Sequence, residues 1–320
     1  MSGYNNYRFL GAIVARGLRK AKQLKNPDTV EVTNFLLDNS PKFINTLDFL
    51  ILAEEILFEE QSGRFLFPEN KNLLEALDKA KVDIGINSAF LPYDRVCISF
   101  PNDYEICGRK PKGVCVSVDL PEERQKGFDW VCKQLNIPPV TLDHGSTHEE
   151  LALGTVYINY KGEDDSFCRV SWNISTLSEI IGSDLETALT KFTDFDPRKN
   201  VNVFKVDRDE KIFQIHLLRT VVRLLIYCEA MPDKVRAGLP DSKAGTKNIK
   251  PIGQIVSLPE SARREEGSKA PSFVSVHLRQ LKDKRYYQGE HATKPQGSRF
   301  VFVKPHLRGM KDAHPETVEL

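Results

Sequence analysis

The sequence lacks the marks of several large classes of protein. Its six cysteines include no CxxC pair and no CxxH combination, so a zinc ribbon or a redox-active thiol pair is not expected. The first 25 residues lack the uninterrupted apolar segment and the small-residue cleavage site of a signal peptide. The most apolar stretch, residues 43–58, is interrupted by Asp48, Glu54 and Glu55, which predicts an amphipathic or buried helix instead of a membrane span. These absences predict a reduced, cytoplasmic protein with no membrane partner.

Sequence motifs for nucleotide binding and for serine hydrolysis are also missing. The patterns GxGxxG, GxxxxGK[ST] and GxSxG do not occur, so neither chemistry has support. His144 and His148 are flanked by Asp143 and Glu149, and their spacing on a helix would direct both imidazoles to one metal ion. Gly145 and the lack of an HExxH pattern favour a solvated loop or a helix cap instead. We therefore expect no bound metal and no cofactor.

The composition is that of a large globular protein with an uneven charge distribution. The 320 residues are 40% hydrophobic and 28% charged, which favours two lobes or one large α+β body with a sizeable core. The net charge is only +1, but residues 233–320 carry 17 Lys and Arg against 10 Asp and Glu, whereas residues 1–232 carry 28 against 34. Four of the seven histidines also lie in the C-terminal part. A basic, histidine-bearing module therefore follows an acidic body.

Apolar periodicity divides the chain into three expected parts of an α+β fold. Residues 1–92 show helical spacing and predict a helical N-terminal lobe. Residues 93–208 predict a mixed α+β body, in which alternating segments such as RVCISF and GVCVSVDL form an antiparallel sheet in the middle of the chain. Residues 209–320 predict a long central helix, a long loop and a basic β-hairpin module.

Several elements within these parts are well defined by their residues. Pro121 opens a helix, residues 154–174 predict a hairpin, and two short helices are expected before Phe192. A broad apolar stripe over residues 209–230 predicts the central helix. The loop over residues 231–270 is rich in Gly, Pro, Lys and Ser, and a loop of that length is expected to be functional or disordered.

The expected C-terminal hairpin pairs SFVSVHLRQL with SRFVFVKPHL and carries most of the candidate site. His277 and Arg279 are two residues apart and share one face of a strand, with Arg299 on the facing strand. Cations interleaved with aromatic rings are typical of RNA binding, because cations neutralise phosphates and rings stack on unpaired bases. The candidate residues for contact with RNA or a partner are His277, Arg279, Lys282, Arg285, Tyr286, Tyr287, His291 and Arg299.

Two alternative roles for the basic module stay open. In the first, its charges are solvated or pair with the acidic body, and the protein has a structural or assembly role. In the second, the module cleaves RNA without a metal ion, and His277, His291 and Glu290 are the nearby groups able to act as acid and base. We expect a binding protein in preference to a ribonuclease, because spacing along the chain fixes no catalytic geometry.

Residues 218–309 also resemble a known family. The shared features are the helix that ends in CEAMPD, the following Gly238-Leu239-Pro240, the His277-x-Arg279 pair, the aromatic turn at 286–289 and the apolar strand at 300–303. In these features the chain is similar to a family spread across phages and other mobile elements. That family includes type V-A anti-CRISPR proteins that lower the messenger RNA of the target effector nuclease.

The resemblance implies a counter-defence protein that needs no cofactor and works in the cytoplasm of a bacterial host. Its expected partners are the target protein or its nascent chain, together with the messenger RNA or the ribosome. Such a protein needs a groove for a peptide and a contact with RNA, and the acidic body and the basic module can divide these tasks. The chain departs from the family at residues 280–283, where the family carries a fuller basic stretch, so the target stays open.

Overall fold

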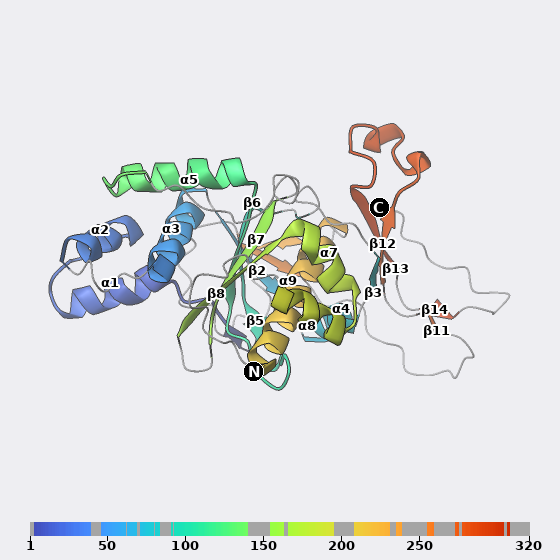
Figure 1. Cartoon of the computed structure of the whole chain (residues 1–320), viewed down its shortest axis with the longest axis horizontal. Helices are drawn as coiled ribbons and strands as arrows, with labels where there is room; N and C mark the ends of the chain where they lie inside the picture. The colour runs from blue at the N-terminus through green and yellow to red at the C-terminus, as the bar shows by residue number, and fades with distance from the viewer. Residues whose placement is uncertain are drawn as a thin grey trace.

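The chain forms three layers, with a β-sheet between two groups of helices (Figure 1). This arrangement confirms the predicted α+β class. Among the described helices, none is both long and apolar enough to cross a membrane. The computed structural model describes residues 3–39, 46–61, 63–68, 71–79, 81–83, 91, 93–139, 154–162, 166–194, 208–230, 235–238, 255–258, 273–274, 277–303 and 306–307.

The central sheet contains seven strands within the described part of the chain. They are β2 (Arg64–Pro68), β4 (Arg95–Ile98), β6 (Val114–Asp119), β7 (Thr155–Lys161), β8 (Phe167–Asn173), β9 (Arg236–Ala237) and β10 (Ile255–Leu258). Their order across the sheet is β8-β7-β6-β4-β2-β10-β9. Strands β4, β6, β7 and β8 pair antiparallel, as their alternation predicts, and β7 with β8 is the expected hairpin.

The sheet differs from the prediction in its parallel strands. β2 lies within residues 1–92, where the sequence predicts a helical lobe, and it pairs parallel with both β4 and β10. β2 has only five residues and lies between two helical segments, so the helical spacing on either side conceals it. Its side chains Phe65, Leu66 and Phe67 are all buried, as expected of a parallel strand covered on both faces.

Helices cover both faces of this sheet (Figure 1). On one face lie α4 (Lys71–Lys79), α7 (Ile174–Gly182), α8 (Leu185–Asp194) and α9 (Arg208–Ala230), which share one apolar core with the strands. On the other face lie α3 (Thr46–Glu60) and α5 (Pro121–Gln134), and α1 (Leu10–Lys20) and α2 (Thr29–Asn39) pack beside α3. The helix predicted at Pro121, the two short helices and the central helix are confirmed as α5, α7, α8 and α9.

Helix α9 also fixes the ends of two neighbouring helices. The Arg219 guanidinium donates to the carbonyl oxygens of Ile180 and Ser183 at the end of α7, at 2.8 Å each. The Arg223 guanidinium donates to the carbonyl oxygen of Leu77 near the end of α4, at 3.1 Å. The last carbonyls of a helix have no partner within it and carry partial negative charge, so the two cations hold α4 and α7 against α9.

The sheet face beneath α3 and α5 carries buried polar side chains beside an apolar cluster. Glu54 of α3 is fully buried and accepts hydrogen bonds from Arg124 and Arg169 at 2.7 Å each and from Asn159 at 2.6 Å. Arg124 of α5 also donates to Asp119 of β6 at 3.1 Å. One carboxylate therefore joins α3, α5, β7 and β8, and its two cationic partners offset the loss of hydration on burial.

The next residue, Glu55, contacts a different element. Its carboxylate accepts a hydrogen bond from the Tyr7 hydroxyl at 3.0 Å and from the backbone N–H groups of Leu10 and Gly11 at 2.7 and 2.9 Å. Leu10 and Gly11 are the first two residues of α1, whose first turn holds no acidic residue of its own. Glu55 therefore caps α1 from another helix.

The predicted C-terminal hairpin is confirmed as β12 (His277–Leu281) paired antiparallel with β13 (Arg299–Val303). β12 also pairs parallel with β3 (Lys81–Asp83), which comes from the N-terminal part of the chain. Two further short pairs occur, β1 (Tyr4–Asn5) with β5 (Phe100–Pro101) and β11 (Phe273–Val274) with β14 (His306–Leu307). The long loop predicted over residues 231–270 lies mostly outside the described residues.

Replacing Glu54 by Gln should destabilise the protein by about 3–5 kcal/mol, because Arg124 and Arg169 would keep buried charges without their shared carboxylate. Urea titration at neutral pH measures the free energy of unfolding. The control is Glu186→Gln, which removes a carboxylate from a pair with Arg208 whose side chains are 72% and 63% exposed. The control should change stability by at most about 1 kcal/mol, and equal effects of the two substitutions would contradict the prediction.

Glu54 should also make stability depend on pH in acid. Burial acts to raise its pKa, but Arg169 and Arg124 lower the pKa from 4.5 to about 2. As the pH falls, Glu54 is therefore protonated in the unfolded chain before it is protonated in the folded chain. The stabilisation is present above pH about 4.5 and is lost as the pH falls towards 2. The difference in unfolding free energy between wild type and Glu54→Gln should shrink over that range in urea titrations. A difference that stays constant with pH would contradict the assignment.

Candidate functional site

The tip of the C-terminal hairpin holds most of the candidate residues predicted from the sequence. We call residues 279–299 the hairpin tip. It contains two short 3-10 helices, η3 (Lys284–Tyr286) and η4 (Gly289–His291). The Asp283 carboxylate caps η3 by accepting a hydrogen bond from the backbone N–H of Arg285 at 3.0 Å. The connection between β12 and β13 is thus an ordered unit.

Two of the candidates, Tyr287 and Arg299, hold the hairpin tip together. The Tyr287 hydroxyl donates to the carbonyl oxygen of Leu281 at 2.6 Å and accepts from the backbone N–H groups of Gly297 and Arg299 at 2.7 and 3.0 Å. The Arg299 guanidinium donates to the carbonyl oxygen of Tyr286. Both side chains are half-buried and their hydrogen bonds lie within the tip, which gives them a structural role.

Other candidates place positive charge on the outside of the hairpin tip. The side chains of Arg279, Lys282 and Arg285 are exposed. The Arg285 guanidinium lies 4.8 Å from the centre of the Tyr286 ring and 3.6 Å from a carboxylate oxygen of Asp283. Exposed ion pairs of this kind contribute little free energy, so the pairing leaves the cation accessible to a ligand.

The strand register places Arg279 and Arg299 on one face of the hairpin. Arg299 lies opposite Leu281, and residues opposite each other in an antiparallel pair share a face, as do residues two apart on one strand. The structure thus brings the two arginines of the predicted site to the same side of β12 and β13.

Some of the predicted site residues have side chains outside the described part of the chain. This holds for the side chains of His277 and Glu290, two of the three candidates for RNA cleavage, and for the pair His144 and His148. The third candidate, His291, is half-buried in η4. Within the described ranges, no group of three or more His, Cys, Asp or Glu side chains could hold a metal ion.

A second surface, which the sequence analysis missed, lies where the loop between β5 and β6 meets α9. Ile106 and Arg109 of this loop exchange two backbone hydrogen bonds, at 2.8 and 2.9 Å. Cys107 and Gly108 form the tight turn between them, with φ angles of 51° and 76°. The residues before and after this turn line two different pockets, which we call the acidic pocket and the basic pocket.

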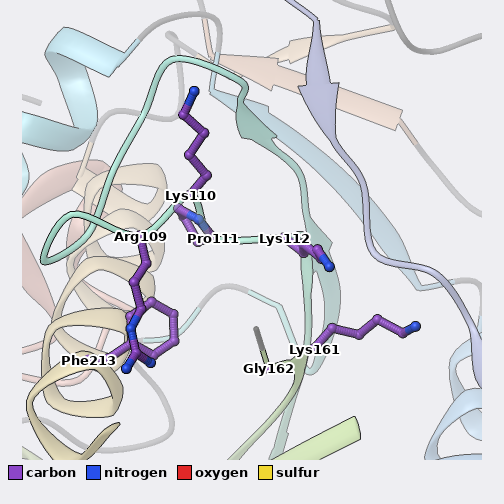
Figure 2. Close-up of a pocket in the computed structure, with 7 residues that line it drawn as sticks. All are labelled: Arg109, Lys110, Pro111, Lys112, Lys161, Gly162 and Phe213. Carbon is purple, nitrogen blue, oxygen red and sulfur yellow. The ribbon is translucent and has the colours of Figure 1, made fainter. Parts of the chain in front are cut away.

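The basic pocket has a volume of about 190 Å³ and is lined by Arg109, Lys110, Pro111, Lys112, Lys161, Gly162 and Phe213. Figure 2 shows the Lys161 side chain extending away from Arg109 and Phe213, and the Lys110 side chain extending away from the other cations. The Arg109 guanidinium lies 5.1 Å from the centre of the Phe213 ring and 2.5 Å from a carboxylate oxygen of Glu210. Four cationic residues thus surround the pocket.

The acidic pocket has a volume of about 130 Å³ and is lined by Glu75, Asp78, Tyr104, Glu105, Ile106, Cys107 and His216. Asp78 Oδ1 lies 3.4 Å from Nδ1 of His216. Burial acts to raise the pKa of Asp78, but His216, Arg223 and Arg219 lower it below its ordinary value, so Asp78 is charged at neutral pH. The Glu105 side chain is exposed at the pocket.

The loop that lines both pockets is fixed to α9 at several points. The Tyr104 hydroxyl lies 3.1 Å from the Thr220 hydroxyl, before the turn. After the turn, Arg109 contacts Glu210, which also accepts a hydrogen bond from the Tyr160 hydroxyl at 2.6 Å. Both pockets therefore have walls that are held in place without a ligand.

Comparison with protein-family models shows the relationship of this chain to known proteins. The model of the anti-CRISPR type V subtype A2 family, described as AcrVA2-like, matches residues 70–309. The chain belongs to this family. The match confirms the resemblance seen in residues 218–309 and extends it over the residues of both pockets and the hairpin tip. No curated protein and no solved structure matched the chain.

The pocket residues carry only a weak signal in the sequence. The run Arg109-Lys110-Pro111-Lys112 has three cations in four residues and marks one wall of the basic pocket. Lys161 and Phe213 lie far along the chain and belong to no motif, and the carboxylates of the acidic pocket are equally dispersed. The pockets therefore become visible only once α4 and α9 are placed.

Replacing Tyr287 by Phe should loosen the hairpin tip, because one hydroxyl satisfies three backbone groups there. Amide hydrogen exchange at Gly297 and Arg299 should accelerate roughly 5- to 30-fold, as expected for a loss of about 1–2 kcal/mol. The matched control is Tyr286→Phe, whose hydroxyl accepts from the exposed Arg285 side chain and should leave these two amides unchanged. Equal exchange in the two variants would contradict the structural role of Tyr287.

Proposed function

We propose that this anti-CRISPR family member recognises the polypeptide of a type V-A effector nuclease during its synthesis and causes loss of the messenger RNA that encodes it. The body of the protein binds the polypeptide, and the hairpin tip contacts the messenger or the ribosome. The family match supports counter-defence against a type V-A system. The charge distribution of the chain supports the division of tasks between body and tip.

The cationic surface of the hairpin tip is the observation that carries the RNA contact. Residues 277–303 contain six Lys and Arg against two Asp and Glu. Arg279, Lys282 and Arg285 are exposed there, and Arg285 lies beside the Tyr286 ring. Cations bind the phosphate backbone and rings stack on unpaired bases, so this combination suits single-stranded RNA. The acidic residues of the body repel RNA and favour contact at the tip.

The alternative function is an RNA-binding protein or endoribonuclease that acts on RNA by itself. Cleavage needs an acid and a base placed on either side of a phosphate. Of the three candidate groups at the tip, only His291 has a described side chain, and it is half-buried. The exposed cations Arg279, Lys282 and Arg285 favour a binding role. A dependence of messenger loss on translation separates the two functions.

In bacterial cells that produce a type V-A effector nuclease, the chain should lower the effector messenger RNA. Lys282→Glu combined with Arg285→Glu should abolish most of this loss, because the reversed charges repel phosphates. Quantitative reverse-transcription PCR of the effector transcript, relative to an unrelated transcript, measures the effect. An effector transcript without a start codon should persist, since no nascent chain is made from it.

The matched control combines Lys126→Glu with Lys133→Glu, the same charge change on exposed positions of α5, and it should act like wild type. Equal loss of the translated and untranslated transcripts would favour direct RNA cleavage and contradict recognition of a nascent chain. Full activity of the tip variant would exclude the hairpin tip as the RNA contact. Inhibition of the nuclease at an unchanged transcript level would contradict messenger loss altogether.

A further inference from the structure

The two pockets beside the Ile106–Arg109 turn have opposite charge although they share one loop and one helix. The basic pocket has Arg109, Lys112 and Lys161 in its wall, and the acidic pocket has Asp78 and Glu105. The same loop supplies both signs, because its residues before the turn line one pocket and its residues after the turn line the other. A ligand that fills both pockets must therefore carry both charges.

The pockets are close enough together for one short ligand. On α9, Phe213 lines the basic pocket and His216 lines the acidic pocket. Three residues of an α-helix advance about 4.5 Å along its axis. An extended peptide advances about 3.3 Å per residue and turns every second side chain to the same side. Side chains at positions i and i+2 on one side of such a peptide are about 6.6 Å apart, which is enough to span this axial advance.

The size and rigidity of the pockets suit side chains better than a small-molecule cofactor. Their volumes of about 190 and 130 Å³ are below the roughly 300–1,000 Å³ of typical small-molecule sites. The loop is fixed by the Tyr104 contact with Thr220 and by the Arg109 contact with Glu210. A site that is already ordered loses less conformational entropy on binding, which offsets part of the entropy that a flexible peptide loses.

Nucleic acid fits this surface less well than polypeptide. A phosphate suits the basic pocket, whose wall contains Arg109, Lys112 and Lys161. A nucleic acid strand that continued into the acidic pocket would bring its next phosphate towards Glu105 and Asp78. The negative charges of the phosphate and the carboxylates would repel each other. A polypeptide avoids this repulsion by placing a Lys or Arg side chain against the carboxylates.

We propose that the Ile106–Arg109 turn and its two pockets form a docking site for an extended polypeptide segment with a basic and an acidic side chain two residues apart. The acidic side chain enters the basic pocket, and the basic side chain enters the acidic pocket. The inference rests on the proposed function, since it assigns a place on the body where the target polypeptide binds. It also specifies the charge pattern of the polypeptide segment that is recognised.

The test uses two probes with the purified full-length chain. The first is a set of overlapping peptides that span a type V-A effector nuclease, and the second is a displayed library of short random peptides. Peptides that bind should contain a basic and an acidic residue at i and i+2 in one fixed order. Fluorescence polarisation of the best peptide then gives its dissociation constant for wild type and variants.

Glu105→Lys and Lys112→Glu should each weaken binding of that peptide by at least about tenfold. The double variant should bind the peptide in which the two charged residues are exchanged more tightly than wild type binds that peptide, and this gain distinguishes recognition of charge from damage to the fold. Glu122→Lys and Lys126→Glu make the same charge changes on exposed positions of α5, across the sheet from α9, and should bind like wild type (Figure 1). Circular dichroism confirms that each variant is folded.

The outcomes separate this inference from the proposed function. If an effector peptide binds wild type and both pocket variants equally, the docking site is wrong while recognition of the target polypeptide stands. If no effector peptide binds but the random library yields the mixed-charge pattern and the pocket variants lose it, the docking site stands and the proposed target is wrong. If neither probe yields the mixed-charge pattern, the docking site is overturned.

Discussion

Two adjacent buried glutamate side chains help to hold the helical layer formed by α1, α3 and α5 onto the sheet. Neighbouring residues of a helix point about 100° apart, so Glu54 and Glu55 of α3 contact different elements. Glu54 neutralises Arg124 and Arg169 over the sheet, and Glu55 caps α1. An apolar residue in place of Glu54 would remove this carboxylate from Arg169 and would leave Arg124 paired with Asp119. This dipeptide therefore supplies the polar contacts between α3 and its neighbours, beside the apolar clusters that α3 forms with the sheet and with α5.

The sequence predicts those elements whose patterns are local. The strands of the β7–β8 hairpin and the long helix α9 follow from alternation and from an apolar stripe, because each pattern is complete within one segment. β2 and β3 are short, and they pair with β10 and β12 from the other end of the chain, so no local pattern reveals them. The carboxylates within residues 43–58 correctly indicate a buried helix, but their cationic partners become known only from the fold.

In the candidate site, too, the sequence reveals the local patterns and only the fold reveals the contacts. The sequence groups the cations and rings of the hairpin tip, yet it cannot tell that Tyr287 and Arg299 satisfy backbone groups while Arg279 and Lys282 face outward. The two pockets have walls from α4, the loop after β5, β7 and α9, and side chains that meet only in space leave no motif. The family match spans both surfaces, in keeping with a protein that uses the body for one contact and the tip for another.

The pairing of β3 with β12 affects the order in which the two surfaces form during synthesis. β3 ends at Asp83 and β12 begins at His277, so this contact closes a very long loop, and such contacts form slowly. The pockets are built from residues up to His216, whereas the hairpin needs the chain as far as Val303. A partly translated copy can thus complete the pockets before the C-terminal hairpin exists, and the two surfaces first coexist near the end of biosynthesis.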